Sequence, residues 1–178
     1  MKKLLVYLTL LIIPALSFAT SIEGFKDIKF GMNMSQLQNL GFACDVSKNT
    51  CVSHDFSSGN SYAKGNLTIF DKKVKSVHVA LNAKGEASTI TVVIGINDAI
   101  AVQDSIIATF GSPKKVSGID MDKNKGMTNG VSTSYWSIGN VELSTMTVFG
   151  GTLRTSAVIF KNLSSIDSKD APKPSKDF

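Results

Sequence analysis

The chain has 178 residues, of which 43% are hydrophobic, 19% charged and 8% aromatic. This length and composition suit one globular domain, or two small fused ones, and exclude a disordered or fibrous chain. The net charge is only +5, and the sole close group of lysines, at 72–75, is typical of a solvated hairpin turn, so we expect no nucleic-acid partner.

Residues 1–19 have the organisation of a secretory signal peptide. Two lysines precede an apolar run over 4–16, and Ser17 and Ala19 place small residues at a cleavage site before Thr20. A membrane anchor is the alternative, but the run is shorter than the about 20 apolar residues that span a bilayer. The first cysteine is Cys44, so the expected mature N-terminus at Thr20 has no thiol for lipid attachment. We therefore expect an exported protein, periplasmic or extracellular, that is neither membrane-spanning nor lipidated.

The chain has two cysteines, Cys44 and Cys51. In an oxidising compartment they are expected to form a disulfide. Lys48-Asn49 between them can turn, which indicates a hairpin of two short strands. A catalytic C-x-x-C motif would have only two intervening residues, so a structural role is favoured over a redox role.

Two segments carry helix signals. A short helix is expected over 35–40, with a capping box of Ser35 and Gln38 and with Gly41 as the residue that ends it. A longer helix of about 13 residues is expected over 98–110. Asn97 or Asp98 is the expected cap of this helix, and Gly111 and Pro113 are expected to end it. Its expected apolar stripe consists of Ala99, Val102, Ile106, Ile107 and Phe110.

The remaining apolar residues alternate with polar ones, as in half-buried β-strands. A mostly antiparallel sheet with two helices, an α+β fold, is the expected architecture. A flexible C-terminal tail is expected over 163–178, where Ser, Asp, Lys and Pro replace the alternation. The expected strands cover 67–69, 77–81, 90–94, 114–119, 132–138, 140–149 and 154–161. Turns are expected at 71–73, 139–140 and 150–151.

Similar lead-in segments precede the two helices. These are Phe30-Gly31-Met32-Asn33 and Ile94-Gly95-Ile96-Asn97, and each helix ends in a hydrophobic residue followed by glycine. The pattern suggests that the single α+β domain over 20–162 is a tandem duplication, with halves 20–86 and 87–162.

The segment 30–37, which leads to Leu40-Gly41, resembles the helix signature G-M-S/T-x-x-E/Q-V/L of the β-lactamase-inhibitor-protein-like superfamily. The segment 110–113 resembles the helix ending L/F-G-x-P of the same superfamily. That superfamily includes tandem inhibitor proteins and small outer-membrane assembly lipoproteins, which pack short helices on an antiparallel sheet. This chain lacks the lipid-attachment cysteine of the lipoprotein branch. The resemblance implies an α+β fold that binds other proteins.

The two histidines, His54 and His78, give little sign of catalysis. His54 sits directly beside Asp55, a spacing that does not let the carboxylate orient the imidazole, and His78 alternates with Val77 and Val79. Nucleophile-elbow, zinc-protease and P-loop motifs are absent from the sequence. We therefore expect a protein that is not an enzyme and needs no cofactor.

A weak candidate calcium site lies in a polar stretch, where Asp120, Asp122 and Asn124 alternate. An EF-hand loop needs Gly at its sixth position and Glu at its twelfth, and here Lys125 and Val131 stand there. A hairpin loop without metal is the favoured interpretation.

Tyr135 and Trp136 are adjacent in an expected strand, so their rings must point to opposite faces of the sheet. One face should meet the helix stripe, and the ring on the other face, together with Met146, is a candidate partner-binding surface. We expect an exported protein-binding module that acts as an inhibitor or accessory factor for another protein. A structural or assembly component of the cell envelope, or a small hydrolase, are the alternatives.

Overall fold

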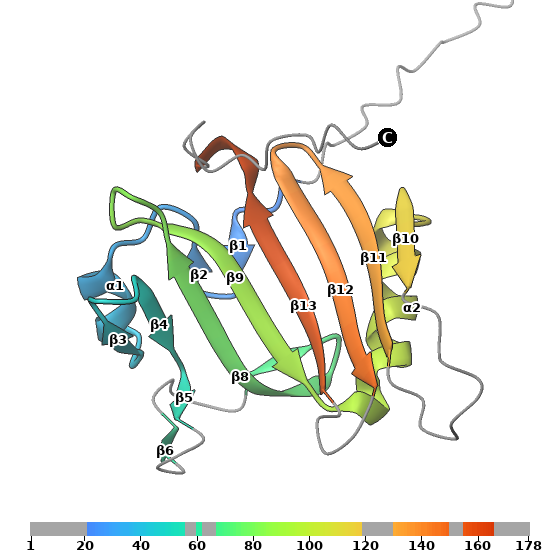
Figure 1. The fold of residues 1–178 in the computed structure, drawn as a ribbon, viewed down its shortest axis with the longest axis horizontal. Helices are drawn as coiled ribbons and strands as arrows, with labels where there is room; N and C mark the ends of the chain where they lie inside the picture. Colours follow the sequence, from blue (N-terminus) through green and yellow to red (C-terminus); the bar gives the residue numbers. More distant parts are fainter. Residues whose placement is uncertain (1–20, 56–59, 62–66, 119–129, 150–154, 166–178) are drawn as a thin grey trace, which may run out of the picture.

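The computed structural model describes residues 21–55, 60–61, 67–118, 130–149 and 155–165. They form an α+β fold in which one large antiparallel sheet carries its helices on a single face (Figure 1). This confirms the predicted fold class. The predicted signal peptide lies outside the described residues, as does the expected tail beyond its first three residues. Within the described residues, no helix is long and apolar enough to cross a membrane.

The strands follow the predicted order, with additional short pairs near the N-terminus and at His54–Ser61. In chain order the elements are β1 Gly24–Phe25, β2 Ile28–Lys29, α1 Met34–Asn39, β3 Ala43–Asp45, β4 Thr50–Val52, β5 His54–Asp55, β6 Asn60–Ser61, β7 Thr68–Ile69, β8 Lys72–Leu81, β9 Ala87–Ile94, the 3₁₀ turn η1 Ile96–Asp98, α2 Ala99–Phe110, β10 Lys115–Gly118, β11 Gly130–Ile138, β12 Val141–Phe149, β13 Thr155–Asn162 and the 3₁₀ turn η2 Leu163–Ser165.

The order of strands in the sheet is symmetric about its centre. It runs β10-β11-β12-β13-β9-β8-β4-β3, with β7 paired to β8 beside this path. β9 and β13 pair at the middle, and each ends a series that starts with a helix: α1, β3, β4, β8, β9 on one side and α2, β10, β11, β12, β13 on the other. Such an order is what a tandem duplication would produce, with β9 in the first half instead of the second. The duplication itself stays a prediction.

Helix α1 begins one residue earlier than expected, and its cap differs from the predicted one. Asn33 Oδ1 accepts a hydrogen bond from Gln36 N at 3.0 Å, and Gln36 Oε1 accepts one from Asn33 N at 2.9 Å. The predicted capping box of Ser35 and Gln38 was therefore wrong. Asn33 has the extended backbone that a capping residue needs, whereas Ser35 is already inside the helix.

Both helices end at the predicted glycines. At the end of α1, Gly41 has a φ of 91°, its N–H donates to the carbonyl of Gln38 at 2.8 Å, and Phe42 N–H donates to Leu37 at 3.1 Å. This is a Schellman ending, which requires a left-handed residue and so favours glycine. Gly111, with a φ of 82°, ends α2.

The start of α2 departs from the expected side-chain cap. Asp98 immediately precedes the helix, but its backbone is already helical and its side chain makes no capping hydrogen bond. The 3₁₀ turn η1 supplies the entry into the helix, so the predicted cap by Asn97 or Asp98 was wrong.

The turn between β7 and β8 lies earlier than expected. Phe70 and Asp71 have positive φ values of 46° and 61° and form a two-residue turn. Lys72 already pairs with Ile69, so the turn predicted at 71–73 was wrong and the lysines belong to β8.

The predicted Cys44–Cys51 disulfide is confirmed. The two sulfur atoms are 2.01 Å apart, and the two residues lie directly opposite one another in the β3–β4 hairpin. The bond therefore fixes the short edge strand β3 to the rest of the sheet.

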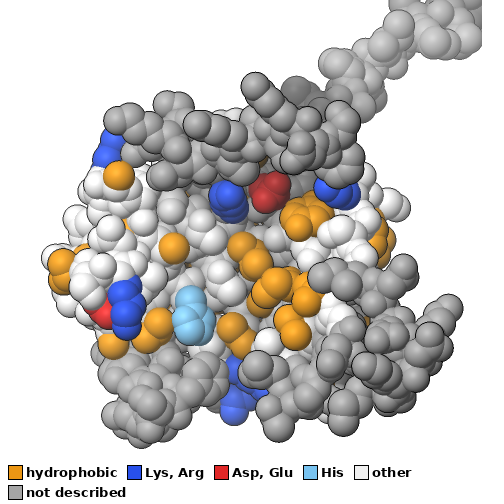
Figure 2. All heavy atoms as spheres, viewed as in Figure 1, with side chains coloured by type: hydrophobic (Ala, Val, Ile, Leu, Met, Phe, Trp, Pro, Cys, Tyr) orange, Lys and Arg blue, Asp and Glu red, His pale blue; other side chains and the backbone are white. Residues whose placement is uncertain are grey.

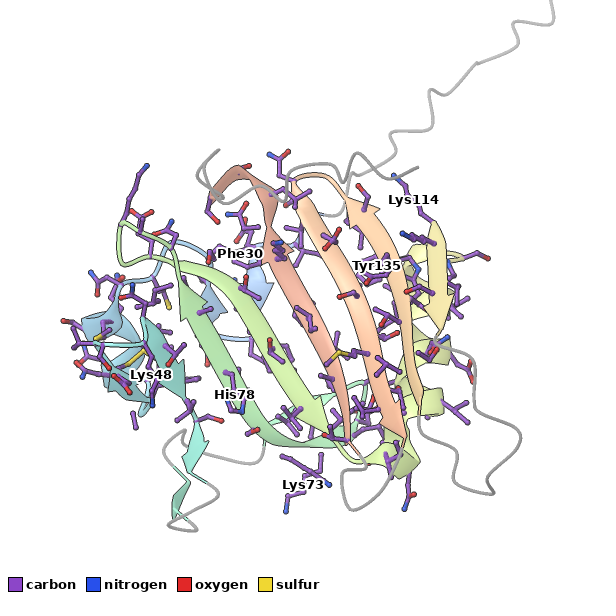
Figure 3. All side chains as sticks on the ribbon, viewed as in Figure 1. Phe30, Lys48, Lys73, His78, Lys114 and Tyr135 are labelled. Carbon is purple, nitrogen blue, oxygen red and sulfur yellow. A yellow bond between two sulfur atoms is a disulfide. The ribbon has the colours of Figure 1, made fainter. Side chains whose placement is uncertain are left out.

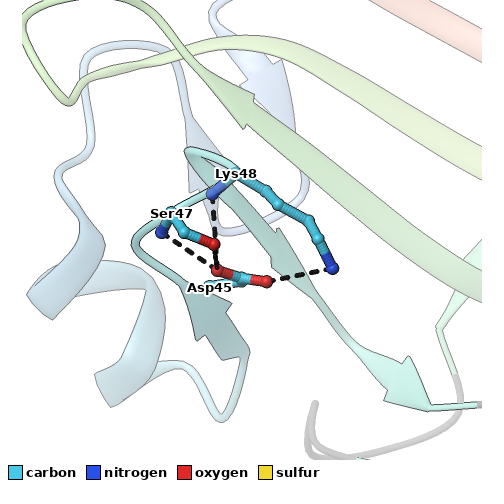
Figure 4. A network of polar contacts seen from close by, with 3 residues as sticks. All are labelled: Asp45, Ser47 and Lys48. Carbon is cyan, nitrogen blue, oxygen red and sulfur yellow. Dashed lines mark hydrogen bonds and ion pairs between the residues drawn. The ribbon is translucent and has the colours of Figure 1, made fainter.

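Asp45 organises the turn of this hairpin (Figure 4). Its Oδ1 accepts hydrogen bonds from Ser47 N at 3.0 Å, Ser47 Oγ at 2.6 Å and Lys48 N at 3.3 Å, and its Oδ2 lies 3.1 Å from Lys48 Nζ. The hydrogen bonds from Ser47 and Lys48 lower the pKa of the Asp45 carboxyl. Such a turn is built by the local polar side chains and needs no core contact.

The face of the sheet that carries the helices is the hydrophobic core, and we call it the inner face. Val102 and Ile106 of α2, Leu37 of α1 and the apolar residues of the β1–β2 hairpin are buried over it. Partners in adjacent strands share a face, so one row of the inner face can be followed across the sheet. It consists of Trp136, Leu143, Phe160, Ile90, Val79, Cys51 and Cys44.

Candidate functional site

The opposite face of the sheet, which we call the outer face, carries neither helix (Figure 1). Apolar side chains gather over its middle strands, with a histidine beside them (Figure 2). One row of this face crosses the whole sheet. It consists of Lys115, Tyr135, Ser144, Ile159, Thr91, His78, Val52 and Ala43.

The structure resolves which of the two adjacent rings faces outward. Trp136 is only 3% exposed and lies in the inner row, where its Nε1–H donates a hydrogen bond to the carbonyl of Gly111 at 2.8 Å. This bond links the sheet to the end of α2. Tyr135 belongs to the outer row and is half-buried (Figure 3). Of the two predicted partner-binding aromatics, Tyr135 is thus the one on the open face.

Met146, the third predicted residue of this surface, lies on the same face as Tyr135. Tyr135 pairs with Ser144 and Thr133 pairs with Met146, so Met146 is the diagonal neighbour of the tyrosine. Diagonal neighbours on one face of a sheet have Cα atoms about 7–8 Å apart, within reach of long and aromatic side chains. The structure therefore brings Tyr135 and Met146 together.

The central strands add apolar residues to this face that were not predicted from the sequence. Val93, Ala157 and Ile159 point outward, because Val93 pairs with Ala157, and Ile159 pairs with the outward Thr91. A signal for this was present: 157–160 is an unbroken apolar run, which indicates a strand with apolar side chains on both faces. We call Tyr135, Met146, Ala157, Ile159 and Val93 the outer patch; Ala157, between Met146 and Val93, is only 4% exposed.

Charged side chains on this face lie at its edges. Glu142 and Lys161 are cross-strand partners near one end of β12 and β13, and Lys115 lies beside Tyr135 in the edge strand β10. The charges flank the outer patch without entering it. An apolar centre with a polar rim is the arrangement found in protein–protein interfaces.

His78 lies at the margin of the outer patch, in β8 (Figure 3). Its Nε2 is 3.1 Å from Ser76 Oγ, and partial burial lowers the pKa of the imidazole. Its cross-strand partners are Thr91 and Val52, neither of which ionises. The neutral imidazole is therefore the favoured form in the folded protein.

The remaining sequence candidates are the His54–Asp55 pair and the weak calcium candidate. His54 and Asp55 form the short strand β5, which pairs with Asn60 and Ser61, and the weak calcium candidate, Asp120, Asp122 and Asn124, lies outside the described residues. Among residues that the structure describes, no group of three His, Cys, Asp or Glu side chains could hold a metal ion.

Comparison with protein-family models, with curated proteins and with solved structures finds no match to this chain. The resemblance of its two helix motifs to the β-lactamase-inhibitor-protein-like superfamily stays a prediction.

Proposed function

We propose that this chain is an exported protein-binding module, and that it captures an envelope or extracellular protein on the outer face of its sheet. The outer patch carries the proposal. A sheet packs one face against helices to bury its apolar side chains, and side chains on the other face are then expected to be polar. Here the other face presents Tyr135, Met146, Ile159 and Val93 without a covering helix.

The outer face is large enough for a stable interface. Five of the eight strands have eight to ten residues and the other three have only three or four, so at about 4.8 Å per strand and about 3.3 Å per residue the face has an area on the order of 800 Å². A standard protein–protein interface buries about 800 Å² on each partner. We therefore expect a partner with an apolar centre that covers Tyr135 and Met146, and with an acidic margin that meets Lys115.

Export is part of the proposal. The predicted signal peptide would send the chain to an oxidising compartment, and the Cys44–Cys51 disulfide is of the kind that persists there. An acyl mass increment on the exported protein, or a retained N-terminus, would contradict the predicted processing before Thr20.

The proposal is tested by site-specific photocrosslinking in the native envelope. A photoreactive amino acid is placed at Tyr135 and, as a control, at Ile100, which is 76% exposed on α2 and lies away from the outer face. We expect one protein to crosslink from position 135 and to be absent from the products of position 100. Crosslinks that are equal at both positions would contradict a binding face on the open side of the sheet.

The same partner, once identified, allows a quantitative test. Truncating Tyr135 to Ala should weaken binding by about 2 kcal/mol, or about 30-fold in Kd, if the ring is a hot spot. Ile100→Ala removes an exposed hydrophobic side chain elsewhere and should leave Kd unchanged. If the only crosslinked product is a second copy of this chain, the outer face is a self-association surface and the proposed capture of another protein is wrong.

A further inference from the structure

Helix α2 alone is too narrow to cover the inner face of the sheet. A helix with its side chains is about 10 Å wide, whereas the sheet extends about 34 Å across its strands. The remaining area is covered by α1, by the β1–β2 hairpin and by the β7–β8 turn, which come from separate parts of the chain (Figure 1). Side chains from these elements do not close completely over the sheet.

A cavity of about 500 Å³ lies where these elements meet. Its walls come from the β1–β2 hairpin, the β7–β8 turn, α2 and the inner face of β12 and β13. This volume is within the about 300–1,000 Å³ of small-molecule sites in proteins. The cavity is on the opposite side of the sheet from the outer patch.

The deep wall of the cavity is apolar. Leu143 and Val158 of the sheet and Ile106 of α2 line it, and all three are buried. Phe160 also lines the cavity and stacks on Phe25 of the hairpin, with ring centroids 6.0 Å apart. A ligand in this part of the cavity would contact aliphatic and aromatic carbon.

The rim of the cavity carries an excess of positive charge. Lys26 and Lys29 of the β1–β2 hairpin line it, together with Glu23. Lys29 Nζ lies 3.7 Å from Glu23 Oε2, but both side chains are largely exposed, so the pair is weak and does not prevent either lysine from meeting a ligand. The rim therefore favours an anionic group above an apolar wall.

We propose that this cavity binds an anionic amphiphile, with a linear alkyl tail against Leu143, Val158 and Phe160 and a carboxylate at Lys26 and Lys29. A fatty carboxylate has both parts of the required chemistry. Binding of this class of ligand would be independent of partner capture on the outer face, because the two sites are on opposite sides of the sheet.

Dodecanoate is the probe, and the single tryptophan gives the readout. Trp136 is the cross-strand partner of Leu143, a residue of the cavity wall. Dodecanoate brominated at its tail end should quench Trp136 fluorescence saturably, with one molecule bound per chain, and dodecanoate brominated beside the carboxylate should quench it less. Equal quenching by the two probes, or quenching only above the micelle concentration, would overturn the proposal.

Charge variants test the rim. Lys26→Glu with Lys29→Glu should weaken dodecanoate binding by about tenfold or more, the loss of about one charge-assisted contact. Lys84→Glu with Lys114→Glu makes the same change in net charge at exposed positions away from the cavity, and should leave the affinity within about twofold. Equal weakening by both double variants would mean that general electrostatics, and not this rim, attracts the anion.

Two further measurements separate this site from the proposed protein-binding face. Tyr135→Ala should retain dodecanoate binding, and Lys26→Glu with Lys29→Glu should retain the photocrosslink from position 135. Loss of dodecanoate binding in Tyr135→Ala would contradict the placement of the ligand on the inner side of the sheet.

Discussion

Trp136 and Tyr135 are neighbours in β11, yet they belong to two different surfaces. The tryptophan faces inward and is hydrogen-bonded to the end of α2, whereas the tyrosine faces outward and is half-buried beside Met146. The inner row runs through buried side chains from Trp136 to the disulfide at the opposite edge of the sheet. Two adjacent aromatic residues therefore separate the packed core of the inner face from the surface that we propose for binding.

The largest effect is expected from truncating the inward ring. Trp136→Ala leaves a cavity in the core and removes the hydrogen bond to Gly111, so it should lower the free energy of unfolding by about 3–5 kcal/mol. Tyr135→Ala on the same strand should lower it by less than about 1 kcal/mol. Urea unfolding of both variants, followed by circular dichroism, makes the comparison. Equal losses would show that both rings are structural and that the binding site lies elsewhere.

The disulfide at the other end of the inner row should contribute somewhat less than Trp136 to the free energy of unfolding. The chain-entropy model assigns about 2.5 kcal/mol to closing a loop of this size. Cys44→Ala with Cys51→Ala should lose about that much stability, and reduction of the native protein should lose a similar amount. Free thiols in exported protein, detected by alkylation without reductant, would contradict the role of this bond.

A smaller loss of stability should show which residue caps α1, the observed Asn33 or the Ser35 expected from the sequence. Asn33→Ala removes the side chain that accepts from Gln36 N and should cost about 1 kcal/mol. Ser35→Ala, at the position first expected to cap the helix, should change the free energy of unfolding by less than about 0.5 kcal/mol. If the serine variant were the less stable, α1 would begin at the later position in solution.

Local patterns predicted the elements and the C-terminal ends of both helices, but not the N-terminal caps of the helices. Strands β9 to β13 were found because their side chains alternate with a period of two, and the helix ends because Gly41 and Gly111 adopt positive φ. The start of α1 was wrong because Asn33 and Ser35 are both good capping residues two positions apart. Asn33 has an extended backbone and forms an antiparallel bridge with Glu86, a contact distant in sequence that the local pattern does not predict.

The candidate surface could be predicted only in part for a related reason. Because side chains alternate between the two faces of a strand, Tyr135 and Trp136 must face opposite sides of the sheet, but this rule does not predict which side the helix will cover. That choice depends on α2, which reaches the sheet from 25 residues away in the sequence and accepts the indole hydrogen bond at Gly111. The apolar run over 157–160 indicates that β13 has apolar side chains on both faces, but the position of Val93 beside it depends on the pairing of β9 with β13, which are distant in sequence.

The smallest predicted effect is a pH-dependent change in stability that comes from His78 on the outer face. Partial burial lowers the pKa of His78 in the folded protein below its ordinary value of 6.5. The unfolded chain therefore takes up a proton at a higher pH than the folded protein does, so stability should fall as the pH decreases through 6.5 and level off below the folded pKa. Asp45 titrates below 3.8 and contributes outside this range. Since the imidazole is partly exposed, the change should be small.

His78→Gln isolates this contribution. Glutamine keeps a polar side chain near Ser76 but cannot titrate, so the difference in stability between the native protein and the variant should shift in favour of the variant as the pH is lowered from about 7.5 to about 5. Thermal unfolding at a series of pH values measures it. A difference that shifts toward the native protein on acidification would mean that the protonated imidazole is stabilised on the outer face. In that case the face would accommodate a positive charge at its margin, and an acidic group of the partner would be the expected neighbour of His78.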